Sequence, residues 1–258
     1  MRRLTNLGWS DVPYGATDHL VQSKKRLLTG IALLWADAGG TPVLMGAGAV
    51  LVNVHRTKTV QLSPGPLNLG YIAWLAEREE DTESILKVLD VFLVQTRRDA
   101  HALAWHNAAD DLHVMKTLRP NSAGVTGITE AWKSRRTPDT GIARCVDTAI
   151  DMPSNGLLAD TADAHWLPLG HALLPHQEQG HVQQRYRDLA EAAGDPKTID
   201  GVTQSVAAGA LAQAYTVALL GGRHLGLLDW EEPPPAFASL ERVAWDELPN
   251  LFRTTPAA

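Results

Sequence analysis

Two acidic residues in the middle of the chain are the strongest candidates for chemistry. Residues 102–105 predict a short strand, His106 and Asn107 follow it directly, and Asp110 and Asp111 come next, at the start of an expected helix. A carboxylate at such a position can supply an oxygen ligand to a divalent cation that activates water. Acidic residues at a helix start also cap backbone N–H groups and favour the helix dipole. The pattern leaves a metal site and a helix cap both open.

Cationic residues that could meet phosphate follow this segment. They are Lys133, Arg135 and Arg136, and Lys and Arg are frequent partners of phosphate oxygens. Short cationic clusters are also common on solvated protein surfaces. We therefore take the three residues as candidates for substrate binding, on the condition that the loop that carries them folds toward Asp111.

Histidines gather further along the chain, beside Asp163 and Glu178. They are His165, His171, His176 and His181. Metal-binding histidine pairs on one helix face are normally three or four positions apart, whereas these are five or six apart. The spacing favours exposed histidines over a metal site. Cys145 is the only cysteine, which excludes an internal disulfide and a cysteine-based zinc cage.

The segments around these candidates predict an α/β domain. Residues 27–36, 43–54 and 57–62 are expected to form an antiparallel meander of three strands. Helical spacing then runs through Ile72, Leu75 and residues 85–93, with Asp81 or Thr82 as a plausible cap. The remaining elements expected are strands at 102–105 and 144–146 and helices at 109–118, 169–193, 199–220 and 240–248. This succession predicts a mixed sheet of about five strands, the first three antiparallel, flanked by helices.

Composition divides the chain into three expected parts. Residues 1–26 predict an irregular N-terminal arm, residues 27–228 the α/β domain, and residues 229–258 a Pro-rich spacer with a short helix. The longest hydrophobic runs fall far below the roughly 20 residues of a membrane-spanning helix. With no signal peptide in sight, we expect a cytoplasmic protein without a membrane partner. The net charge of −6 argues against a protein that coats a duplex, and less against one that grips a strand end.

The segment from Ala104 to Leu112 resembles the second motif of the DEDD-type 3'–5' exonucleases, in which a strand ends in His-Asn and an Asp follows four residues after the Asn. The run Cys145-Val146-Asp147-Thr148 is similar to a later strand of that family, which ends in Asp-Thr. The resemblance covers about residues 27–225. It implies a ribonuclease H-like fold, Asp111 as a metal ligand and catalytic carboxylate, and His106 and Asn107 beside the substrate.

The first and third family motifs are degenerate in this chain. The first motif, Asp-x-Glu, aligns with Trp35-Ala36-Asp37, so Trp35 replaces the leading Asp and Asp37 is the remaining candidate metal ligand and catalytic carboxylate. For the third motif, which carries the general base, one register offers Gln204 with Gly209-Ala210. The other offers Gln183 and Gln184 with Asp188. Neither register supplies a base, and the loss of a base costs a factor of about a hundred or more in rate.

These departures set the functional expectation. Two dications need about six oxygen ligands each, so Asp37 and Asp111 would bind Mg²⁺ or Mn²⁺ weakly at best, and Trp35 should lie within reach of Asp111. We expect an exonuclease-like protein that binds a single-stranded nucleic-acid end or a nucleotide and is weak or inactive as a nuclease. One alternative is an active exonuclease with ligands from Asp147, Asp151 or Asp188. Another is a protein-interaction subunit that uses the Pro-rich tail and terminal helix.

Overall fold

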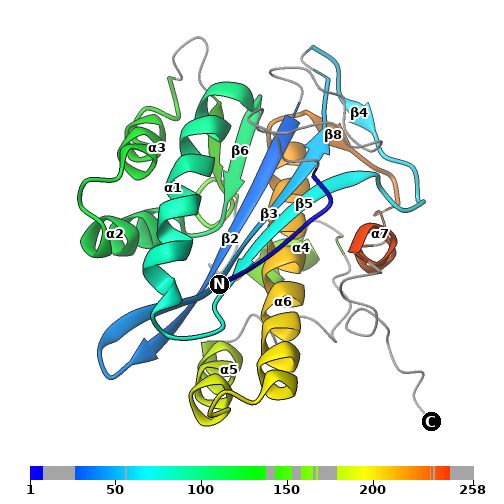
Figure 1. Cartoon of the computed structure of the whole chain (residues 1–258). Helices are drawn as coiled ribbons and strands as arrows, with labels where there is room; N and C mark the ends of the chain where they lie inside the picture. Colours follow the sequence, from blue (N-terminus) through cyan, green and yellow to red (C-terminus); the bar gives the residue numbers. More distant parts are fainter. Residues whose placement is uncertain are drawn as a thin grey trace, which may run out of the picture.

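The computed structural model of the chain describes residues 1–7, 27–55, 57–137, 143–152, 158–164, 167, 179–232, 234 and 236–244. The protein is an α/β structure built on a mixed six-stranded sheet in the order β1-β5-β3-β2-β6-β7 (Figure 1). The strands of this sheet are β1 (Arg2–Thr5), β2 (Leu27–Ala38), β3 (Thr41–Asn53), β5 (Leu69–Leu75), β6 (Ala102–Trp105) and β7 (Arg144–Asp147). A separate pair of parallel strands joins β4 (Val60–Gln61) to β8 (Leu228–Asp229).

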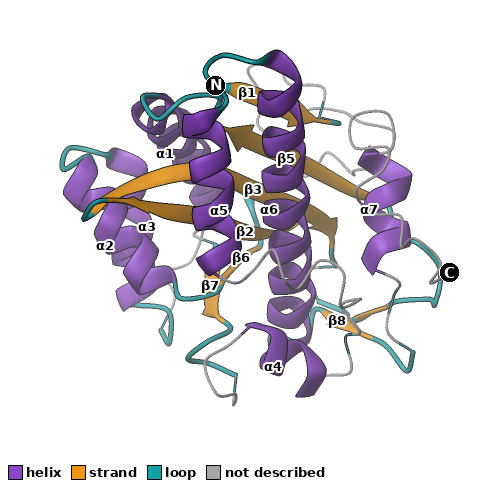
Figure 2. Cartoon of the chain, turned by 90° about the horizontal axis from the view of Figure 1, so that it is seen from below, coloured by secondary structure: helices purple, strands orange, loops and turns teal. Residues whose placement is uncertain are grey.

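Helices cover both faces of the sheet (Figures 1 and 2). On one face lie α1 (Asp81–Asp99), α2 (Ala108–Leu118) and α3 (Ala123–Lys133). The residues packed on the other face belong to α4 (Leu158–Ala164), α5 (Gln179–Glu191), α6 (Pro196–His224) and α7 (Ala236–Ala244).

The sheet brings three strand ends to the same edge. Strands β2 and β3 form a long antiparallel hairpin whose turn uses Gly39 and Gly40, both at positive φ, a conformation that glycine adopts without steric cost. Strand β6 runs parallel to β2, pairing with residues 28–30, and β7 runs parallel to β6. The carboxyl ends of β2, β6 and β7 therefore point the same way, which places the segments after Trp35, Trp105 and Val146 along one edge.

Helix α6 packs against the sheet almost backbone to backbone. A Cβ added to Gly30 would lie 2.1 Å from the carbonyl oxygen of Ala214, and one added to Gly48 would lie 2.7 Å from the carbonyl carbon of Ala210. Among the described residues α6 is long and apolar enough to cross a membrane, but 94% of its most apolar window is buried inside the protein. Such burial is typical of a core helix.

The opposite face is filled by large side chains. Trp74 and Phe92 pack edge to face with ring centroids 5.2 Å apart, a geometry that aromatic pairs favour. Helix α3 is tied to α1 through Asp90, whose Oδ1 accepts hydrogen bonds from the backbone N–H groups of Gly124 at 2.7 Å and Val125 at 3.1 Å. These bonds satisfy N–H groups that have no partner within their own helix.

The prediction of three antiparallel strands is confirmed, but the third strand was wrongly placed. Residues 57–62 contribute only β4, which lies outside the main sheet, and the third strand is β5. Every residue of β5 is buried, so its sequence lacks the alternation of a half-exposed strand. The apolar spacing of Ile72 and Leu75 consequently resembled a helix. The expected burial of Ile31, Leu33, Val50, Val52, Val217 and Leu220 is confirmed.

The described parts of both terminal regions contain regular elements that differ from the prediction. The expected irregular arm contains β1, whose Arg2–Thr5 pair with the edge of β5, while residues 8–26 lie outside the described part. Helix α7 begins four residues before the predicted helix and packs on α6. There Ser239 Oγ accepts a hydrogen bond from the backbone N–H of Leu67 at 2.9 Å and lies 3.2 Å from the hydroxyl of Tyr215. The apolar residues Leu240 and Ala244 are buried, so these two side chains of the helix already pack within the chain.

Candidate functional site

Asp111 lies between two indole rings at the carboxyl ends of β2 and β6. The indole N–H of Trp35 donates to Oδ1 of Asp111 at 2.9 Å, and that of Trp105 donates to Oδ2 at 2.7 Å. The predicted proximity of Trp35 and Asp111 is therefore confirmed. We call this arrangement the Trp35–Asp111–Trp105 cluster. It links two strands to the first turn of α2.

Local backbone features position the cluster. The β2–β3 register shifts between Leu34 and Trp35, and such a bulge re-aims the side chains that follow it. Helix α2 begins after Asn107, which has a left-handed backbone with φ 58°. Left-handed geometry is uncommon outside glycine, although Asn tolerates it better than most residues. Together these features bring Trp35 and the first turn of α2 to the same place.

Asp147, which lies outside the helix, accepts hydrogen bonds from the free backbone N–H groups at the start of α2. This fully buried carboxylate accepts hydrogen bonds from the backbone N–H groups of Asn107 at 3.0 Å, Ala108 at 3.2 Å and Ala149 at 3.0 Å. Burial raises the pKa of Asp147, and these backbone donors oppose the rise. Because Asp147 supplies the cap, Asp111 is left to the two indoles.

Burial is also the main influence on the charge of Asp111. The pKa of Asp111 is raised to about 7, chiefly by burial and to a smaller extent by the negative charges of Asp110 and Asp147, while the indole donors of Trp105 and Trp35 oppose the rise. The carboxyl therefore changes its charge near neutral pH, which distinguishes it from an ordinary exposed aspartate.

The second candidate carboxylate, Asp37, is engaged differently. It is exposed at the end of β2, and its Oδ1 accepts a hydrogen bond from the backbone N–H of Gly40 at 2.6 Å. The side-chain amide of Gln183 on α5 accepts from the backbone N–H of Asp37 and donates to its carbonyl, both at 2.8 Å. This pair of bonds connects α5 to the end of β2. Gln204, which the other register offers, donates to Asp200 at 2.8 Å.

The cationic candidates divide into one paired residue and two exposed ones. Arg135 forms an ion pair with Asp151 at 3.2 Å and lies over the ring of Trp132 at 5.1 Å. Asp151 in turn accepts a hydrogen bond from the backbone N–H of Asp147 at 2.9 Å, which connects Arg135 to the strand ends. Lys133 and Arg136 are exposed.

The His-Asn pair lies at the same edge. The Nδ1 atom of His106 is 2.9 Å from the hydroxyl of Thr148, which also donates to the carbonyl of Trp105 at 3.3 Å. Asn107 is exposed. Asn107 accepts a hydrogen bond from the backbone N–H of Asp111 through its carbonyl, and Arg135 is connected to this edge through Asp151.

These residues do not fit a two-metal centre. Each oxygen of Asp111 already accepts an indole N–H, and a donor hydrogen directed at a carboxylate oxygen competes with a cation for it. Within the described ranges, no three His, Cys, Asp or Glu side chains gather as a possible ligand set. Of the alternative ligands, Asp151 pairs with Arg135, and Asp188 pairs with Arg185 at 3.0 Å. His165, His171 and His176 lie outside the described residues.

Sequence reasoning missed two parts of the site. It did not assign a role to Trp105, although this residue ends β6 immediately before the His-Asn pair. It named Asp147 only as a possible metal ligand, whereas the carboxylate caps α2. The sequence did contain a signal for both residues. Trp105 and Asp147 each end one of two neighbouring parallel strands, and such strand ends meet at one edge of the sheet.

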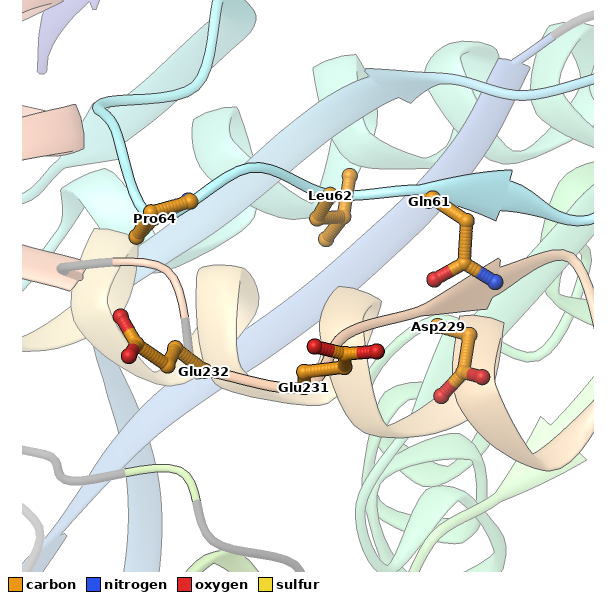
Figure 3. A pocket seen from close by; sticks show the side chains of 6 residues that line it. All are labelled: Gln61, Leu62, Pro64, Asp229, Glu231 and Glu232. Carbon is orange, nitrogen blue, oxygen red and sulfur yellow. The ribbon is translucent and has the colours of Figure 1, made fainter.

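Two pockets lie elsewhere on the described surface. One, of about 590 Å³, opens between residues 61–64 and residues 229–232 (Figure 3). Its lining is Gln61, Leu62, Pro64, Asp229, Glu231 and Glu232. The other, of about 420 Å³, lies between residues 77–80 and the corner that joins α5 to α6. Neither is lined by a residue of the Trp35–Asp111–Trp105 cluster.

Comparisons with protein-family models, with curated proteins and with solved structures found no match to this chain. The site must therefore be interpreted from its own geometry.

Proposed function

We propose that this protein is a non-hydrolysing relative of the DEDD-type exonucleases, with a ribonuclease H-like fold, that binds a single-stranded nucleic-acid end or a nucleotide. The observation that carries the proposal is the 2.9 Å hydrogen bond from the Trp35 indole to Asp111. A bulky indole stands where the sequence resemblance places a metal-binding carboxylate, and it uses the oxygen that a metal would need.

The strand arrangement supports the proposed ancestry. The resemblance implies three antiparallel strands followed by parallel strands that alternate with helices. Strands β5, β3, β2, β6 and β7 are ordered in this way. Asp111 follows β6 and Asp147 ends β7, as the two aligned motifs require.

The ligand count argues against two-metal hydrolysis. The resemblance implies that active relatives use divalent metal ions, which activate water and neutralise phosphate charge. Here the carboxylate of Asp37 accepts a hydrogen bond from its own turn, and Gln183, which one register of the resemblance aligns with the general base, bonds to the backbone of Asp37. An amide cannot accept the proton of an attacking water as a base does. We therefore infer that a bound strand end remains intact, and that any Mg²⁺ or Mn²⁺ binds weakly.

The interaction-subunit alternative has less support, since α7 buries Leu240 and Ala244 within the chain. The terminal helix proposed to bind a partner therefore already has part of its apolar surface packed inside the chain. The active-exonuclease alternative needs Asp147, Asp151 or Asp188, and each of these carboxylates has partners of its own.

A nuclease assay tests the proposal directly. The purified protein is incubated with a labelled single strand in Mg²⁺ and then in Mn²⁺, and binding of the same strand is followed by fluorescence anisotropy. We expect binding without release of nucleotides. Digestion that the Asp111→Ala variant abolishes would overturn the proposal. Absence of both digestion and binding would favour the interaction-subunit alternative.

A gain-of-function variant tests the role of Trp35. Trp35→Asp restores a carboxylate beside Asp111 and removes one indole donor, so Mn²⁺ should stabilise this variant against heat. Trp35→Phe is the matched control, because it removes the same donor without adding a ligand. We expect a Mn²⁺-dependent rise in melting temperature for Trp35→Asp alone. An equal rise in both variants would contradict the assignment of Trp35 to the metal position.

A further inference from the structure

Trp35 is oriented by its hydrogen bond but is not enclosed. Its indole N–H is fixed on Asp111 at 2.9 Å, and the residue remains partly exposed at the carboxyl end of β2. Trp105, which donates to the same carboxylate, is fully buried. Trp35 packs against the core but is a partly exposed aromatic side chain, and its hydrogen bond to Asp111 sets its orientation. A ligand that stacks on its exposed part therefore loses little side-chain entropy on binding.

The charges around Trp35 select against a phosphate at this point. Asp37, two residues along the same strand, and Asp110, which raises the pKa of Asp111, are both exposed carboxylates. Arg135, the cation connected to this edge, already pairs with Asp151. A phosphate beside Trp35 would therefore face these carboxylates, and Arg135 already has a partner.

A nucleobase suits the same surroundings. Stacking of a base on an aromatic side chain needs no charge on either partner. The amino groups of adenine, cytosine and guanine are hydrogen-bond donors, and carboxylates such as Asp37 and Asp110 are acceptors. A quaternary ammonium ion would also tolerate the carboxylates, but its sites are aromatic cages, and Trp105, the other ring of the cluster, is buried.

We propose that Trp35 is a stacking platform for one unpaired nucleobase, and that the protein recognises the base of a nucleoside or of a strand terminus and not its phosphate. The inference rests on the proposed function, whose binding site it assigns to one residue. It also accounts for nucleic-acid recognition by a chain with a net charge of −6, because stacking does not require a basic surface.

The inference is tested by titrating guanosine, adenosine, cytidine and uridine, and then a short single strand, while tryptophan fluorescence is recorded. We expect the nucleosides with amino groups to bind more tightly than uridine, and the affinity of guanosine to match that of its monophosphate. Binding should change little between low and moderate salt, unlike binding through phosphates.

Variants distinguish a loss of base stacking at Trp35 from a loss of folding. Trp35→Ala should weaken nucleoside binding by roughly 5- to 150-fold, the range expected for loss of one stacked base, whereas Trp35→Phe should retain most of it. Trp74→Phe, a change at a buried ring of β5, is the control for altered tryptophan content. Circular dichroism and melting temperature confirm that each variant is folded.

The outcomes distinguish this inference from the function on which it rests. Strand binding that falls steeply with salt and is unchanged in Trp35→Ala would overturn the stacking platform and leave the proposed function standing. Tetramethylammonium binding that depends on Trp35, without nucleoside binding, would reassign the ring to a cationic ligand. Binding of neither nucleoside nor strand would overturn both proposals.

Discussion

The two faces of the sheet are packed by opposite means. On the α6 face, glycines in β2 and β3 allow a helix rich in alanine to lie against the strand backbones. On the α1–α3 face, large side chains such as Trp74, Phe92 and Trp105 pack between the sheet and the helices. The indoles of Trp35 and Trp105 both donate hydrogen bonds to Asp111. At Gly30 and Gly48 the first face has no room for an added methyl group. The second face is built from large side chains, and the Trp35–Asp111–Trp105 cluster lies beside them.

The largest effect is expected from one methyl group on the α6 face. Gly30→Ala would place Cβ 2.1 Å from the carbonyl oxygen of Ala214, so the helix must move, at a cost of at least about 3 kcal/mol in unfolding free energy. Urea denaturation measures this loss. In the matched control, Gly201→Ala, the new Cβ in α6 meets nothing within 4 Å, and it should stabilise the protein by up to about 1 kcal/mol. Equal effects at the two glycines would contradict the close packing of α6.

A smaller loss is expected from the donor on the opposite face. Trp105→Phe keeps an aromatic ring but removes the N–H that donates to Asp111 at 2.7 Å. Hydrogen bonds to charged groups contribute about 1.5–3 kcal/mol, and the unfolding free energy should fall by that amount. The measurement is again urea denaturation, at a pH above 7 where Asp111 is ionised. A variant as stable as the parent would show that the hydrogen bond from Trp105 to Asp111 does not contribute to the unfolding free energy.

Replacing a large side chain by a smaller one on the α1–α3 face should lower the unfolding free energy less. Phe92→Leu keeps an apolar side chain against Trp74 and loses part of a ring, and we expect a decrease of about 1–2 kcal/mol. Removing these atoms should therefore harm the protein less than adding one methyl at Gly30. The reverse ranking in the same denaturation series would break the comparison between the faces.

The smallest effect per unit of change is a slope of stability with pH, although this slope accumulates between the unfolded pKa of 3.8 and the folded pKa of about 7 of Asp111. The folded pKa of Asp111 is raised from 3.8 to about 7, so between these values the folded protein binds more protons than the unfolded chain. Stability should accordingly fall as pH rises from about 4 to about 7, by at most about 1.4 kcal/mol per pH unit from this residue. Asp111→Asn should have a shallower slope over the same range. Parallel curves for the two proteins would assign the slope to other groups, such as Asp147, whose pKa is also raised.

The mixed sheet and the contact between Trp35 and Asp111 could be predicted from the sequence. Trp35 ends a strand and Asp111 begins a helix, so a single alignment brought them together. Strand β5 was misplaced because burial on both sides removed its alternation. Helix α3 was missed, since its glycines and β-branched residues lower the intrinsic helix propensity, and its stability comes from Asp90 and the packing on α1. The position of the Trp105 ring depends on register, which sequence alone leaves open.

The close fit of α6 also has a consequence for synthesis on the ribosome. The helix segment that contacts Gly30 emerges roughly 180 residues after it, which is about 10–40 s of translation at typical rates. During that interval the glycine-rich side of β2 and β3 has no native cover, and the growing chain exposes backbone that later lies against α6. Nascent chains halted before residue 196 should therefore depend strongly on chaperones, and completion of α6 should release them.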